Sequence, residues 1–187
     1  MSHQISITEN GTTTLATAGK YCDRNIDVNV NVPSNEAELE EQKTITNGIV
    51  DRTITGEYVN NEILSVGAYA FNNCKSLESV IFTNATYIYA YAFDWCEALK
   101  RVELASLNPD TPSLYGNAFR NCPLLEKVII RNNRAIKLSN VNVFSNTGIS
   151  AGTGYIYVPD DLVDSYQTAT NWSTYASQIK PISELEA

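Results

Sequence analysis

The amino-acid sequence predicts a repeat solenoid, mainly β, with a small N-terminal β module and a C-terminal helical cap. The main observation is a segment that occurs three times, as VGAYAFNNCKSLESVIF (66–82), IYAYAFDWCEALKRVEL (88–104) and LYGNAFRNCPLLEKVII (114–130). The other two are a strictly alternating stretch near the N-terminus and an amphipathic stretch after the last repeat. Repetition at such a period is typical of stacked coils.

The repeat has fixed apolar positions. Four phenylalanines, 22, 26 and 25 residues apart, anchor the copies: Phe71, Phe93, Phe119 and Phe144. An insertion, NPDT (108–111), accounts for the longest spacing. Three, six and nine residues after the anchor, the first three copies have Cys74, Cys96 and Cys122; Leu77, Leu99 and Leu125; and Val80, Val102 and Val128. The fourth copy has Thr147, Ser150 and Thr153 there, so it is expected to decay after its first half, as terminal repeats do.

Each copy is expected to add one short strand to a stack. In SVIFT (79–83), alternation turns Val80 and Phe82 inward and Ser79 and Ile81 outward. Stacked strands lie about 4.8 Å apart, so each coil covers the apolar side chains of its neighbour. A single coil cannot bury its own apolar face, and three or more are needed. We therefore expect a right-handed solenoid of about four coils.

The pattern [IV]-G-x-x-A-F-x-x-C-x-x-L-x-x-V resembles the BspA-like leucine-rich repeat, and the resemblance covers about residues 49–159. It departs from the pattern at Tyr89, where glycine is usual, and at Thr147. The segment 5–33 is similar to a small module at the start of phage tail-associated proteins of Gram-positive gut bacteria. The segment 152–182 is similar to the closing segment of repeat proteins in such prophages.

Four segments are predicted: a β module (1–33), a linker with a short helix (34–48), the repeats (49–159) and the cap (160–187). In the module, NIDVNVNVP predicts a half-buried strand, and ISITENGTTTL supplies one or two partner strands around Asn10-Gly11. About thirty residues bury little surface, so the module is expected to dock on a partner or self-associate. The linker favours a solvated helix over a coiled-coil stub, because only Leu39 holds a strong core position.

The predicted cap follows a last strand in GYIYVPDDL, where Ile156 and Val158 face inward. Asp160 or Asp161 is expected to begin a helix. The apolar face of the helical segment comprises Leu162, Val163, Tyr166 and Ala169, continued by Trp172, Tyr175 and Ile179.

Composition excludes several partners. The net charge is −8, and the densest basic spot is RNNR (131–134), so neither nucleic acid nor an anionic membrane surface is expected to bind. No apolar run approaches the roughly 18 residues of a transmembrane helix, so we expect no membrane insertion. The opening residues, MSHQISITENG, show no signal peptide. This absence favours a virion protein, which leaves the cell by lysis.

Catalytic chemistry is not expected. Cys74, Cys96 and Cys122 share one repeat position, and a metal cluster or a redox pair is conceivable at strand spacing. However, the thiols would point in parallel into an apolar core with no recurring His or carboxylate, which favours small buried hydrophobes. The only histidine is His3, so no nucleophile has a histidine base, and no glycine-rich phosphate loop is present. We predict no enzyme, no cofactor and no metal.

Two candidate binding surfaces remain. The first surface, called the strip, consists of the outward positions of successive strands: Ser79, Ile81, Arg101, Glu103, Lys127, Ile129, Tyr155 and Tyr157. It mixes charged, aliphatic and aromatic side chains, which suits the binding of a protein or a glycan. The second surface carries Tyr69, Tyr91 and Trp95 in the turns. Trp95 stands where two other copies have Asn73 and Asn121, so the repeat does not demand burial there. Alternatively, these aromatics pack along the side of the solenoid or against the N-terminal module.

The favoured hypothesis is a non-enzymatic virion- or tail-associated protein. Its N-terminal module would dock to other virion proteins, and its repeats would bind a protein or glycan of the bacterial envelope. The alternative is a leucine-rich-repeat adhesin of the bacterial surface, binding host proteins or glycans. A third class, a glycan hydrolase, lacks a catalytic pair.

Overall fold

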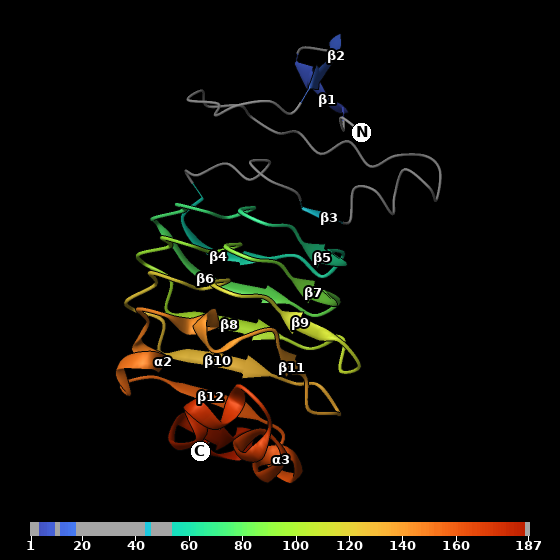
Figure 1. Cartoon of the computed structure of the whole chain (residues 1–187). Helices are drawn as coiled ribbons and strands as arrows, with labels where there is room; N and C mark the ends of the chain where they lie inside the picture. The colour runs from blue at the N-terminus through green and yellow to red at the C-terminus, as the bar shows by residue number, and fades with distance from the viewer. Residues whose placement is uncertain (1–3, 10–11, 18–43, 46–53, 186–187) are drawn as a thin grey trace.

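The computed structural model describes residues 4–9, 12–17, 44–45 and 54–185. Within 54–158 the chain winds between two parallel sheets, and successive coils lie one above the other (Figure 1). The six-stranded sheet contains, in spatial order, β4 (Gly56–Val59), β6 (Leu77–Phe82), β8 (Arg101–Leu104), β10 (Lys127–Ile130), β12 (Tyr155–Val158) and β13 (Ile179–Pro181). The five-stranded sheet contains β3 (Thr44–Ile45), β5 (Ser65–Val66), β7 (Tyr87–Ile88), β9 (Pro112–Leu114) and β11 (Lys137–Leu138). This arrangement is compatible with the predicted repeat fold.

The register places equivalent residues of successive copies side by side. Val102 lies opposite Val80 on one side and Val128 on the other, and Ile156 follows Val128. The predicted inward positions are all buried: Val80, Phe82, Val102, Leu104, Val128 and Ile130. One further strand position precedes the first predicted copy, because Tyr58 of β4 lies opposite Val80.

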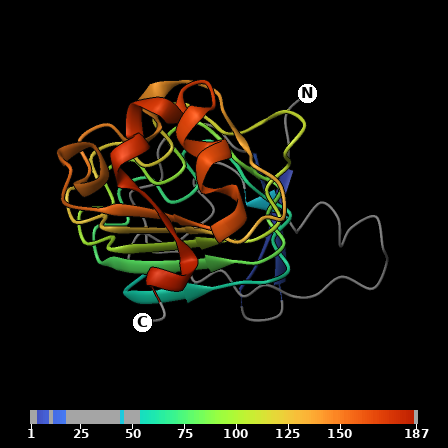
Figure 2. The ribbon, with the colours of Figure 1, turned by 90° about the horizontal axis from the view of Figure 1, so that it is seen from below.

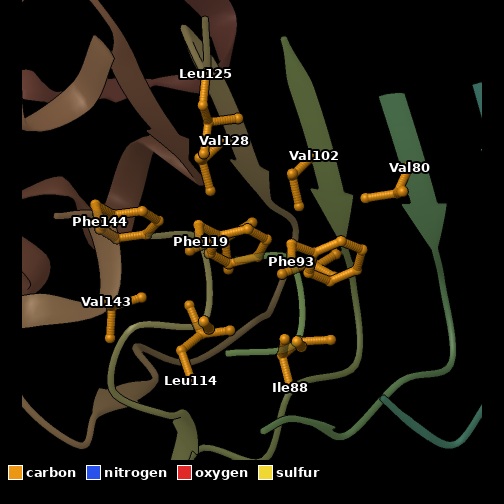
Figure 3. Close-up of a cluster of buried hydrophobic side chains, with 14 of the residues drawn as sticks. Val80, Ile88, Phe93, Val102, Leu114, Phe119, Leu125, Val128, Val143 and Phe144 are labelled. Atoms are coloured by element: carbon orange, nitrogen blue, oxygen red, sulfur yellow. The ribbon is translucent and has the colours of Figure 1, made fainter. Parts of the chain in front are cut away.

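The anchor phenylalanines stack along the core. Ring centroids are 4.8 Å apart for Phe71 and Phe93, 5.2 Å for Phe93 and Phe119, and 5.7 Å for Phe119 and Phe144. Each such pair contributes about 0.5–1.5 kcal/mol beyond the burial of its area. Figure 3 shows the row Phe93, Phe119 and Phe144 between Val80, Val102 and Val128 on one side and Ile88, Leu114 and Val143 on the other.

Cys74, Cys96 and Cys122 are buried, as expected if they act as small hydrophobic side chains of the core. The Cys96 thiol donates to the Phe71 carbonyl at 3.0 Å, and the Cys122 thiol donates to the Phe93 carbonyl at 3.0 Å. Hydrogen bonding with Cys122 and burial raise the pKa of the Cys96 thiol. A thiol held protonated in this way is a poor nucleophile and a poor metal ligand.

The fourth copy does not decay as predicted; it carries an insertion. The residue opposite Val128 is Ile156, whereas the offset of the other copies points to Thr153, three residues earlier. A short helix, α2 (Gly148–Ala151), follows the 3-10 turn η1 (Val141–Phe144) and occupies this place. Thr147 is buried and caps α2 with its side chain, which explains a hydroxyl where the other copies have a thiol.

The C-terminal segment packs on the last coil (Figure 2). It comprises η2 (Asp160–Leu162), α3 (Val163–Thr168), η3 (Trp172–Gln178), β13 and η4 (Ile182–Glu184). Tyr166 and Trp172 are fully buried, and the Trp172 indole N–H donates to the Ile136 carbonyl at 2.7 Å. Ile179 is buried, as its predicted place on the apolar side requires, but it is not helical, because it begins β13 and lies opposite Ile156 of β12.

Near the N-terminus, β1 (Gln4–Glu9) and β2 (Thr12–Thr17) form an antiparallel pair on either side of Asn10-Gly11, where one or two strands are expected as partners of the strand in 25–33. The predicted strand in 25–33 and the predicted linker helix lie outside the described residues. The boundaries proposed for the four segments stay a prediction.

Candidate functional site

The turns that carry the anchor phenylalanines repeat a left-handed backbone. Two residues before and two residues after the anchor, φ lies close to +60° in successive copies. Asparagine tolerates this conformation, whereas a larger side chain is strained by about 1–2 kcal/mol. The positions before the anchor are Tyr69, Tyr91 and Asn117, and those after it are Asn73, Trp95, Asn121 and Asn146. All three aromatic residues of the second predicted surface therefore hold left-handed positions.

Two of these aromatics form a stacked pair. The Tyr69 and Tyr91 rings are parallel within 1°, with centroids 4.9 Å apart. The Arg120 guanidinium lies 4.9 Å from the centroid of the Tyr91 ring, a cation–π contact. Tyr69 nevertheless remains accessible, since 46% of this residue is exposed.

A buried carboxylate organises the same turns. Asp94 is only 3% exposed and accepts hydrogen bonds from Arg120 Nε at 3.0 Å and Nη2 at 2.7 Å. It also accepts from Asn121 Nδ2 at 3.1 Å. The hydrogen bond to Asp94 raises the pKa of Arg120. The Asp94 carbonyl accepts from Asn72 Nδ2 and from the Asn73 backbone, so one residue ties three successive coils together.

A hollow lies beside this carboxylate. It is lined by Trp95, Glu97, Asn121, Pro123, Leu124 and Asn146. Trp95 is 48% exposed and Leu124 is 46% exposed. The hollow therefore combines an open apolar wall with amide and carboxylate groups.

The strip also comes together, because parallel register aligns its members in two neighbouring rows. One row contains Ser79, Arg101, Lys127 and Tyr155, and the other contains Ile81, Glu103, Ile129 and Tyr157. Two of its three charged members pair with each other, since Glu103 accepts from Arg101. Glu103 also accepts from Arg131 Nε, outside the strip, at 2.6 Å. Tyr155 and Tyr157 are edge-to-face neighbours, and the Lys180 ammonium lies 5.1 Å from the centroid of the Tyr155 ring.

One predicted member of the strip is not available to a partner. Ile129 is 0% exposed, so its prediction as a solvent-facing residue is wrong. In register it lies between Glu103 and Tyr157, whose longer side chains flank it on neighbouring strands. Alternation along a strand gives the face of a residue, and it does not give the cover that neighbouring strands supply.

Sequence reasoning missed Asp94, Arg120, Leu124 and Asn146. A usable signal existed for the first two, because Asp94 and Arg120 each follow an anchor phenylalanine directly, in adjacent copies. Opposite charges at one position of neighbouring coils predict an ion pair. Leu124 carried no comparable signal, because a single leucine in a turn does not reveal its exposure.

The sequence pattern of the BspA type leucine-rich repeat region matches residues 52–167, in six copies. The chain belongs to the BspA-type leucine-rich repeat family. The match confirms the predicted repeats and extends them beyond the four anchored copies, in line with the extra strand position at β4. BspA-type repeats suggest a protein-binding or structural role.

A comparison with curated proteins finds no match. Among the described residues, no helix has the length and apolar character required to cross a membrane. No group of three or more His, Cys, Asp or Glu side chains in that part of the chain could hold a metal ion.

Proposed function

We propose that this BspA-type repeat protein is a non-enzymatic binding protein of a phage virion or tail, and that its repeats bind the bacterial envelope. The observation that carries the binding role is the left-handed backbone of Tyr69, Tyr91 and Trp95. Other copies hold the same turns with asparagine, so the fold does not require aromatic residues there.

Strain of this kind is retained where it serves a function. The two most exposed of these aromatics, Tyr69 and Trp95, are about half open to solvent in the described structure. Trp, Tyr and Arg are the residues that most often carry binding energy, and Arg120 joins the group through its contact with Tyr91. The second predicted surface is therefore better suited to binding than the strip, where the Glu103 carboxylate is already engaged by Arg101 and Arg131.

The virion setting is supported by the resemblance of both flanks, 5–33 and 152–182, to segments of phage and prophage proteins. In this setting the N-terminal module docks to other virion proteins, and the repeats face outward.

Mass spectrometry tests the setting. Particles purified by density from an induced culture are compared with the washed envelope fraction of the same cells, with a capsid protein and a cytosolic enzyme as references. We expect a fixed ratio of this chain to the capsid protein across the particle peak. Enrichment only in the envelope fraction would instead identify a surface adhesin. Distribution parallel to the cytosolic enzyme would contradict both settings.

A further inference from the structure

We propose that the hollow beside Trp95 is a binding site for an uncharged saccharide, which Trp95 holds by stacking and Asn146 holds by hydrogen bonding. The inference builds on the proposed function, because it names the ligand class for the repeat surface. An open indole, two amides of fixed orientation and a local balance of charge support this site.

The indole of Trp95 is an open platform. Within residues 54–185 it has neither a ring partner nor a hydrogen-bond partner for its N–H, whereas the other tryptophan, Trp172, is fully buried and hydrogen-bonded. The face of an indole carries negative potential and attracts the weakly positive C–H groups on one side of a sugar ring. Leu124 and Pro123 extend the apolar wall.

The amides beside the platform have a defined orientation. Asp94 is an acceptor, so Asn121 must present its amide nitrogen to that carboxylate. The Asn121 oxygen then faces Asn146 Nδ2, at 2.9 Å. Asn146 lines the hollow, and its side-chain oxygen accepts no hydrogen bond from the described residues. A sugar hydroxyl is a suitable donor to this oxygen.

The charges at the hollow are neutralised in pairs. Glu97 binds Lys75 at 2.8 Å, and Asp94 binds Arg120 at 2.7 Å. A surface with locally balanced charge, on a chain whose net charge is −8, suits a ligand without charge better than a basic or an acidic one. A neutral saccharide satisfies the platform, the acceptor and this balance together.

The test uses the full chain and two variants, Trp95→Asn and Tyr155→Ser. Trp95→Asn restores the residue of the other copies at a left-handed position, so the variant is expected to fold. Tyr155→Ser removes an exposed aromatic of the strip and serves as the matched control. The probes are an array of neutral glucan, galactan, mannan and N-acetylhexosamine oligomers, and isolated bacterial cell walls before and after periodate or proteinase K.

We expect binding to one neutral class on the array and to walls, abolished by periodate and insensitive to proteinase K. Trp95→Asn should weaken both at least tenfold, and Tyr155→Ser should stay within twofold. Ligand should also shift the emission of Trp95, which is read by subtracting the spectrum of Trp95→Asn.

The remaining outcomes separate the two proposals. Wall binding that proteinase K removes and periodate spares makes the partner a protein, which overturns the saccharide site and leaves the envelope-binding role standing. Array binding that depends on Trp95, without wall binding, supports the saccharide site and contradicts the envelope role. Array binding that is absent, or equal in Trp95→Asn, overturns the saccharide site.

Discussion

Trp95 shows how one residue can depart from its repeat without disturbing the fold. Its backbone follows the left-handed path that asparagine takes at the equivalent positions, and its peptide N–H keeps the hydrogen bond to the next coil. The departure affects the side chain, which is exposed, and the local strain, which the stacked core tolerates. A surface can therefore change at this offset while the packing beneath it stays the same.

We predict that Trp95→Asn stabilises the chain by about 1 kcal/mol, because asparagine relieves the left-handed strain and little buried area is lost. Urea unfolding measures the change. The reverse substitution in the first copy, Asn73→Trp, should destabilise by a similar amount. A loss of stability in Trp95→Asn would mean that the indole packs against part of the chain and is not a free platform.

The contribution of the buried Asp94–Arg120 ion pair to stability can be compared with that of the exposed Asp110–Arg134 pair. Asp94→Asn should cost roughly 2 kcal/mol, because it leaves Arg120 without its charged partner and weakens the side-chain bonds from Arg120 and Asn121 of the next coil. Asp110→Asn breaks an exposed pair with Arg134 and should cost less than about 0.5 kcal/mol. Equal effects of the two variants would contradict the organising role of Asp94.

At the scale of elements, the fourth copy is held close to the third by a residue without a side chain. A Cβ on Gly154 would lie 2.8 Å from Glu126 Cα and 2.9 Å from the Leu125 carbonyl oxygen. Both contacts are with backbone, so β12 would have to move away from β10. This close approach allows the chain to return to register after the α2 insertion.

Gly154→Ala is therefore expected to destabilise the chain by about 1–3 kcal/mol, as overpacking does. Gly152→Asn provides the control, since Gly152 has φ +79° and open surroundings, and asparagine tolerates that conformation. Thermal unfolding of both variants gives the comparison. An unchanged melting temperature for Gly154→Ala would show that β12 shifts without cost.

The C-terminal helices add a dependence on pH. Burial raises the pKa of Tyr166 to about 12, while its hydroxyl accepts the Ile136 N–H at 3.2 Å. The folded chain therefore holds this proton more tightly than the unfolded chain, whose pKa is about 10. The resulting stability is complete below pH 10 and is lost as pH rises towards 12, by roughly 2–3 kcal/mol in total.

Urea unfolding at pH 9, 10, 11 and 12 tests this loss, with Tyr166→Phe as the variant that lacks the titrating group. The parent chain should lose more stability than Tyr166→Phe over this range. Parallel curves for the two proteins would show that Tyr166 ionises equally in both states.

The elements also show what sequence could predict. Period and alternation located Val80, Val102 and Val128 correctly, because a parallel stack repeats one environment at each offset. They failed at Ile129 and at the fourth copy, where cover by a neighbouring strand and a three-residue insertion decide the outcome. At the site, Asn73 and Asn121 occupy the position equivalent to Trp95, and they correctly indicated that this position does not lie in the core. The same asparagines also signalled a left-handed backbone, which alternation patterns do not record.

At the scale of the whole molecule, the parallel stack ends at the C-terminal segment. β13 covers the edge of β12, and Trp172 and Tyr175 pack against Phe144 with ring centroids 6.3 and 5.4 Å away. Without this segment, a strand edge and the end of the phenylalanine row would face water. Exposed edges of this kind pair with other chains.

Deleting residues 160–187 is therefore expected to convert the protein into oligomers or aggregates. Size-exclusion chromatography with light scattering compares the deletion with the full chain at the same concentration. If the shortened chain keeps the mass and melting temperature of the full chain, the C-terminal segment is dispensable for the stack.

The parallel register has a final consequence, which concerns length. Each additional copy of the repeat would lengthen the stack by one strand spacing, about 4.8 Å, and would leave every side-chain offset unchanged. The distance from the aromatic turns to either end of the molecule is therefore set in discrete steps by the number of copies inserted between them. Gene duplication within the repeat array would act as an adjustable spacer, altering how far the surface at Trp95 reaches without redesigning that surface.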